Sequence, residues 1–75
     1  MNISKLHTTE LGLERIRRNL GLETDDVMGW CREVVRNASD NDVVRRGKNY
    51  YVYGENFVLT VNAYSYTVIT AHKQA

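Results

Sequence analysis

The chain has 75 residues, of which 43% are hydrophobic and 25% are charged, and its formal net charge is +1. This composition excludes a disordered chain, and the length predicts one domain over residues 1–75. Cys31 is the only cysteine, which excludes an internal disulfide and a multi-cysteine zinc site, and we expect its thiol to be buried. Because the sequence shows no signal peptide and no apolar run of membrane-spanning length, we expect a cytoplasmic protein without membrane contact.

The first half of the chain has the periodicity of two helices. We expect the first over residues 9–20, where one face carries Leu13, Ile16 and Leu20. Thr8 or Thr9 is suited to cap its start. We expect the second over residues 25–37, where apolar residues recur at Val27, Cys31, Val34 and Ala38. The helical period then stops, and residues 37–42 are typical of a loop.

From Val43 onward, β-branched and aromatic segments indicate strands over residues 43–46, 49–53, 57–62 and 66–71. Connections of two or three residues require antiparallel hairpins. In the third strand more polar residues alternate with Phe57, Leu59 and Val61, so we expect these three to face the helices. The predicted fold class is therefore α+β, with two N-terminal helices packed on one face of a four-stranded antiparallel meander. The other face is left for solvent or a ligand.

Charged and aromatic residues are distributed unevenly along the chain. Residues 1–42 carry six basic and eight acidic side chains, whereas residues 43–75 carry four basic, one acidic and all five tyrosines. Basic groups interleaved with aromatic rings suit RNA, because its phosphates are anionic and its bases stack. Strands alone would also explain much of the tyrosine enrichment.

The candidate nucleic-acid-binding residues are Thr8, Thr9, Arg45, Arg46, Tyr50 and Tyr66. The threonines stand at a helix N-terminus, where free N–H groups attract phosphate, or they form an ordinary cap. The arginines belong to a basic turn that either contacts phosphate or keeps an edge strand from aggregating. The tyrosines are candidates for stacking on bases.

His7 and His72 stand near opposite ends of the sequence. RNA cleavage without a metal needs a base, an acid and a cation for the phosphorane, and two histidines with Arg or Lys supply all three near neutral pH. The competing interpretation is that both histidines are idle, solvated side chains near frayable termini. The sequence has no Walker loop, dinucleotide fingerprint, HExxH or CxxC motif, and its acidic residues lack metal-ligand spacing, so we expect no cofactor and no metal.

Several stretches of the chain resemble a small uncharacterised bacterial family of unknown function. They are residues 6–12, 15–16, 19–21, 47–51 and 69–73. The order of helices before a four-stranded sheet is similar to the barnase, EndoU, colicin and RelE-type ribonuclease superfamily. That resemblance implies a catalytic site formed by His7, Arg15, Lys48 and Thr70, with His72 just beyond. The chain departs from that superfamily in lacking a glutamate in its strands and an arginine on the third or fourth strand.

Two hypotheses from different classes follow. The first is a toxin-like, metal-independent ribonuclease or RNA-binding protein, with His7 and His72 as acid and base, and Arg15 and Lys48 stabilising the phosphorane. The alternative is a non-catalytic protein-interaction module, which binds an antitoxin or a target protein through its exposed sheet face. The first predicts that both histidines and one of the two cations converge within roughly 12 Å. Histidines at opposite ends of the sheet would favour the alternative.

Overall fold

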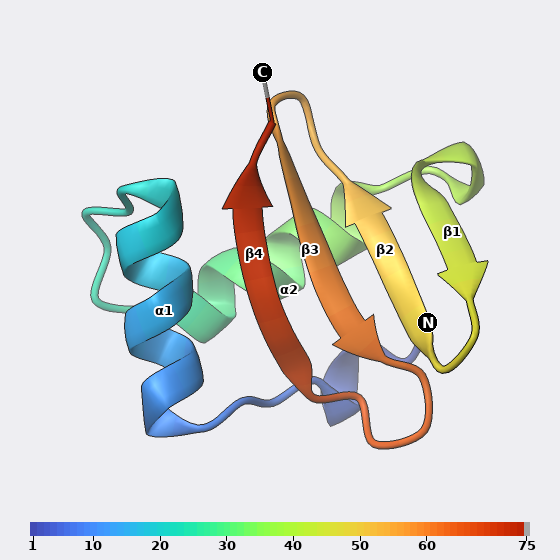
Figure 1. Ribbon diagram of the computed structural model, residues 1–75, viewed down its shortest axis with the longest axis horizontal. Helices are drawn as coiled ribbons and strands as arrows, with labels where there is room; N and C mark the ends of the chain where they lie inside the picture. The colour runs from blue at the N-terminus through green and yellow to red at the C-terminus, as the bar shows by residue number, and fades with distance from the viewer. Residues whose placement is uncertain (75) are drawn as a thin grey trace.

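The computed structural model describes residues 1–74 and has the expected α+β fold, with two helices followed by a four-stranded antiparallel sheet (Figure 1). The helices are α1 (Glu10–Leu20) and α2 (Val27–Asn37), and the strands are β1 (Val43–Arg46), β2 (Asn49–Tyr53), β3 (Phe57–Asn62) and β4 (Val68–Lys73). Short 3-10 turns at Ile3–Lys5 and Asp40–Asp42 precede α1 and β1. None of the helices described in residues 1–74 is long and apolar enough to cross a membrane.

The strands follow one another across the sheet in the order β1-β2-β3-β4. The first three have the predicted bounds, whereas β4 begins at Val68 and not at residue 66, and it continues to Lys73 and not only to residue 71. The reason is the connection before it, in which the Asn62 side-chain oxygen accepts hydrogen bonds from the N–H groups of Tyr64 and Ser65. Tyr66 then adopts a positive φ of 59°, which interrupts the extended backbone.

Both helices begin at side-chain caps. The Thr9 hydroxyl accepts a hydrogen bond from the N–H of Gly12 at 3.0 Å, as expected for a cap. Helix α2 begins two residues later than predicted because its cap is Asp26, whose carboxylate accepts from the N–H of Gly29 at 2.9 Å.

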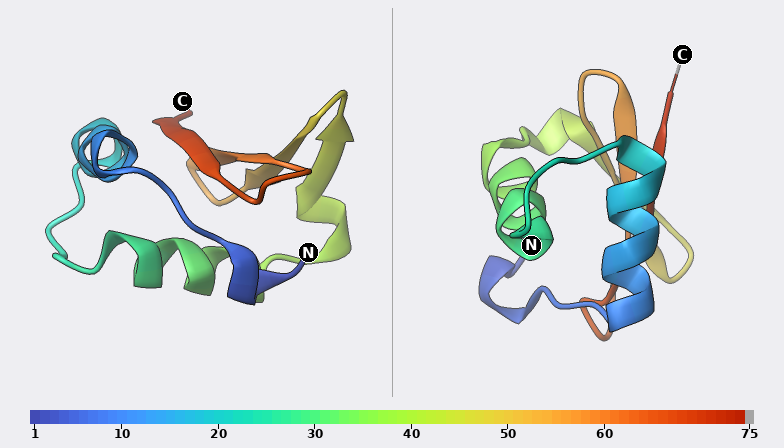
Figure 2. Two further views of the ribbon diagram at one scale, coloured as in Figure 1. Left: turned by 90° about the horizontal axis from the view of Figure 1, so that it is seen from below. Right: turned by 90° about the vertical axis from the view of Figure 1, so that its left-hand side faces the viewer.

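The helices cover different parts of the sheet. Helix α2 crosses one face, and α1 lies beside β4 (Figures 1 and 2). The free edge of β4 is hydrogen-bonded to the N-terminal segment, because the Val68 N–H donates to the His7 carbonyl at 2.8 Å and the Thr8 hydroxyl donates to the Val68 carbonyl at 2.7 Å. Further along, the Asn19 side-chain amide donates to the Ala71 carbonyl at 3.1 Å. This edge is therefore closed to pairing with another chain.

The core lies between α2, α1 and the inner face of the sheet. The alternation predicted for β3 is confirmed, since Leu59 and Val61 are fully buried. On α2 the buried stripe is Val27, Cys31 and Val35, whereas the predicted Val34 and Ala38 are only half-buried. The helix is thus rotated so that these two residues line a pocket. Burial raises the pKa of the Cys31 thiol to about 11, against the opposing charge of Arg32, so the thiol is protonated at neutral pH.

Candidate functional site

The two histidines lie at opposite ends of the sheet. His7 pairs with Thr67 just before β4 begins, whereas His72 lies near the end of β4, opposite Val58. His72 is five residues beyond Thr67, so at about 3.3 Å of rise per residue the strand separates these positions by roughly 17 Å. The expected convergence of His7 and His72 in one active site is therefore wrong.

The His7 ring is engaged through both of its nitrogens. Nδ1 lies 2.9 Å from the carbonyl oxygen of Lys5, which can only accept, so we place the ring proton on Nδ1. Nε2 lies 3.1 Å from the Thr67 hydroxyl and therefore accepts its hydrogen. The Thr67 oxygen is in turn 2.8 Å from the Ser65 hydroxyl. His7 thus fixes the connection before β4, and its free lone pair is already used.

The β1–β2 turn, the β3–β4 connection and the N-terminal segment together form a surface that we call the basic end. The turns lie side by side, because the N–H of Ala63 donates to the Lys48 carbonyl at 2.7 Å, and both are at the lower edge of the sheet in Figure 1. The cations of the basic end are Lys5, Arg45, Arg46 and Lys48. The segments that build it, residues 1–9, 43–53 and 62–68, contain no acidic residue.

The central feature of the basic end is the contact of Arg45 with the rings of Tyr50 and Tyr64, which we call the stack. The Arg45 guanidinium carbon lies 5.3 Å from the Tyr50 ring centre and 5.4 Å from the Tyr64 ring centre. The Arg45 Nε also donates to the Gly47 carbonyl at 2.8 Å, which fixes the side chain over its own turn. Gly47 has a φ of 57°, a conformation that favours glycine in a two-residue hairpin turn. Tyr64 is 75% exposed, so the stack has one ring open to solvent.

A second cation lies on a ring at the same end. The Lys5 ammonium is 6.0 Å from the centre of the Tyr66 ring. Tyr66 is the single non-glycine residue with positive φ among residues 1–74. A bulky side chain rarely adopts this conformation, so the turn carries backbone strain, which often accompanies functional sites.

Some of the predicted site residues lie together at the basic end, and the others lie elsewhere on the molecule. The residues at the basic end are His7, Arg45, Arg46, Lys48, Tyr50 and Tyr66. Thr8 and Thr9 lie in the adjoining segment, but their hydroxyls serve the β4 edge and the α1 cap. Arg15 is exposed on α1, while Thr70 and His72 lie farther along β4.

Sequence reasoning missed Tyr64 and Lys5. Tyr64 is one of the five tyrosines of the basic half, but it lies between the third and fourth predicted strands, outside every predicted element. The available signal was its position in the β3–β4 connection, because neighbouring hairpins put that turn beside the Gly47-Lys48 turn and its arginine. Lys5 precedes the first predicted element, so no pattern in the sequence linked it to Tyr66.

The basic end offers cations, hydroxyls and rings, and its chemistry is that of anion and base binding. The described residues contain no group of three or more His, Cys, Asp or Glu side chains placed to hold a metal ion. His7 and His72, the predicted acid and base, do not lie together at this end: both nitrogens of His7 are hydrogen-bonded, and His72 lies near the other end of β4.

Comparison with known proteins gives a family and no activity. No curated protein and no solved structure matches the chain significantly. One family model matches residues 1–72, which is nearly the whole chain, and it is described as a protein of unknown function (DUF3781). The protein therefore belongs to the DUF3781 family.

Proposed function

We propose that the protein is a non-catalytic RNA-binding module that holds single-stranded RNA at its basic end. The observation that carries the proposal is the Tyr50, Arg45 and Tyr64 stack, whose outer ring is 75% exposed. A ring fixed in place by a cation behind it loses little freedom when a base stacks on its other face. Sequence-tolerant binding of single strands commonly combines such rings with a basic surface.

The cations around the stack support binding to a phosphate backbone. Arg46 and Lys48 are exposed at the end of β1 and in the following turn, on either side of the glycine that shapes it. Each cation that neutralises a phosphate releases a bound counterion, which makes affinity depend on salt. A relation to the barnase, EndoU, colicin and RelE-type ribonucleases would agree with an RNA ligand, and it rests on the order of elements alone.

The test is the affinity of a fluorescently labelled single-stranded RNA of mixed sequence, measured by anisotropy at several salt concentrations. We expect Tyr64→Ala to weaken binding about 5- to 150-fold, because stacking contributes about 1–3 kcal/mol per base. The matched control is Tyr53→Ala, which removes a tyrosine from the open sheet face. Equal losses from the two substitutions would contradict a site at Tyr64.

Cleavage is tested on the same RNA in the presence of EDTA. Because the two imidazoles lie far apart, we expect the wild type, His7→Ala and His72→Ala to leave the RNA intact. Cleavage by the wild type that either substitution abolishes would restore the ribonuclease hypothesis.

A second candidate is the protein-interaction module, and the uncovered face of the sheet favours it. The register places Tyr51 on the same face as Thr60 and Val44, and Tyr53 on the same face as Val58, with neither helix packed over them (Figure 2). Partially exposed rings on a flat sheet suit a protein partner. Under this candidate Tyr51→Ala and Tyr53→Ala would abolish partner capture, whereas Tyr64→Ala would leave it unchanged.

A further inference from the structure

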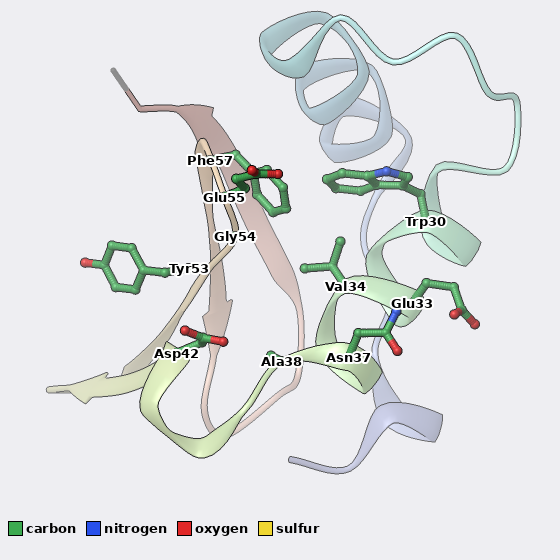
Figure 3. Close-up of a pocket in the computed structure, with 10 residues that line it drawn as sticks. All are labelled: Trp30, Glu33, Val34, Asn37, Ala38, Asp42, Tyr53, Gly54, Glu55 and Phe57. Atoms are coloured by element: carbon green, nitrogen blue, oxygen red, sulfur yellow. The ribbon is translucent and has the colours of Figure 1, made fainter.

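A pocket of about 560 Å³ lies at the end of the sheet opposite the basic end. It opens between α2 and the β2–β3 turn (Figure 3). Trp30 and Val34 project into it from α2, and Phe57 projects from the start of β3. Its volume lies within the range of small-molecule sites, which is roughly 300–1,000 Å³.

Two aromatic rings form the centre of the pocket. The ring centres of Trp30 and Phe57 are 5.1 Å apart, and their planes are inclined by 51°. Both rings are half-buried and contact the core on one side, so only the other side faces the pocket. The Phe57 ring lies so close to Gly54 that a Cβ at that position would collide with it. The glycine thus permits the ring position that shapes the pocket wall.

The charged residues that line the pocket are all acidic. They are Glu33, Asp42 and Glu55, and the lining includes no Lys, Arg or His. Glu33 pairs with Arg36 and points away from the pocket in Figure 3. One oxygen of Asp42 accepts from Ser39. Glu55 makes no side-chain hydrogen bond or ion pair within residues 1–74, so its charge is free for a ligand.

We propose that this pocket binds a small organic cation, an alkylammonium ion with a short hydrocarbon body. The hydrocarbon part would contact Val34 and the ring faces, and the ammonium group would lie between the rings and Glu55. A cation over an aromatic face, most favourably that of Trp, is attracted by the ring quadrupole. The charged side chains that line the pocket are all acidic, which gives it the complementary charge, and an anion or a neutral alkane of the same size lacks that attraction.

The intrinsic fluorescence of Trp30 reports binding directly, because it is the only tryptophan in the protein. We would titrate the full chain with n-butylammonium chloride, using sodium chloride at equal ionic strength as the blank. Butanol and sodium butyrate provide the neutral and anionic molecules of the same length. We expect a saturable change with butylammonium and no saturable change with butanol or butyrate.

Two substitutions locate the site. Glu55→Gln removes an exposed charge and should weaken butylammonium binding about two- to fivefold, as for an exposed ion pair. Glu33→Gln is the matched control, because that carboxylate is already paired with Arg36, and it should leave binding within twofold. Thermal melts of both variants would show that the fold is kept.

The outcomes that overturn the proposal are equally defined. An equal response to butanol would make the site an apolar pocket without charge selectivity, and no saturable response to butylammonium would leave it without this ligand class. Unchanged affinity in Glu55→Gln would place the cation elsewhere. Tighter binding of Nα-acetyl-lysine amide, whose side-chain ammonium is free, than of butylammonium would assign the pocket to a lysine side chain of a protein partner and not to a free small molecule.

Discussion

Both ends of the sheet combine aromatic rings with charged side chains, but the charges have opposite signs. At the basic end the aromatic rings already contact cations from the chain itself, with Arg45 over two tyrosine rings and Lys5 over a third. At the other end Trp30 and Phe57 line an open pocket whose charged groups are carboxylates. The first end presents positive charge and one exposed ring, and the second presents a pocket lined by rings and carboxylates, with no Lys, Arg or His in its lining.

This difference shows that the sign of the charge at each site depends on which charged side chains the neighbouring turns place beside the aromatic rings. The β1–β2 turn carries Arg46 and Lys48, whereas the β2–β3 turn carries Glu55. The net charge of +1 hides this separation, because the basic and acidic groups nearly cancel over the whole chain. A ligand for one end should therefore be indifferent to changes at the other.

The largest effect is expected when the charge of the stack is reversed. Arg45→Glu removes the cation from the two rings and adds an anion at the basic end, so we expect RNA affinity to fall at least roughly 100-fold. Arg15→Glu makes the same change of charge on exposed α1 and should lower affinity only a few fold, through long-range attraction. A similar loss in both variants would mean that RNA senses only the total charge.

Helix α2 forms one wall of the pocket, and its buried Cys31 should make the folded state less stable at alkaline pH. Its pKa is raised from 9.0 to about 11 in the folded state, which means that the folded protein holds the thiol proton more tightly than the unfolded chain does. The stability that this provides is fully present below pH 9 and is lost as the pH rises to 11, by about 3 kcal/mol at most.

Denaturant unfolding of the wild type and of Cys31→Ala, below pH 9 and near pH 11, measures this loss. Every other titratable group is present in both proteins, so the difference between the two isolates the thiol. A difference in unfolding free energy that stays constant with pH would show that Cys31 is less well shielded than its burial indicates.

The strain at Tyr66 predicts a smaller effect at the basic end. Tyr66→Gly and Tyr66→Ala both remove the ring from Lys5, but only glycine adopts the φ of 59° without cost. We expect the glycine variant to be more stable than the alanine variant by about 1 kcal/mol, as measured by denaturant unfolding. Greater stability of the alanine variant would contradict a strained turn.

The smallest effect is expected from Lys48, at the tip of the basic turn. Lys48→Ala should reduce the slope of log affinity against log salt by about 0.7, because one phosphate contact to a single strand is lost. Lys73→Ala, at the far end of β4, serves as its control and should leave the slope unchanged. Equal slopes in Lys48→Ala and the wild type would remove Lys48 from the RNA contact.

Local patterns predicted the elements well where neighbouring residues decide the structure. The bounds of β1, β2 and β3 follow from alternation and short turns, and Thr9 caps α1 as its chemistry suggests. The start of β4 was missed because the Asn62 side chain and the φ of Tyr66 shape that connection, and neither leaves a periodic signal.

The site depended on placement in space, which the sequence determines only weakly. His7 stands at the start of β4 because its backbone pairs with Thr67, sixty residues away by number, and this alone separates it from His72. The Arg45 and Tyr64 contact joins two hairpin turns in the same way. Val34 faces the pocket because α2 turns Val27, Cys31 and Val35 into the core, and that orientation is set by tertiary packing.

Backbone amide shifts in ¹H–¹⁵N spectra, followed while single-stranded RNA is added, test the central claim most directly. The account predicts shifts at residues 45–48 and 62–67 and at Lys5, with residues 30–38 and 54–57 unchanged. Shifts concentrated on Tyr51, Tyr53 and the other residues of the open sheet face, or on the pocket, would contradict the assignment of RNA binding to the basic end.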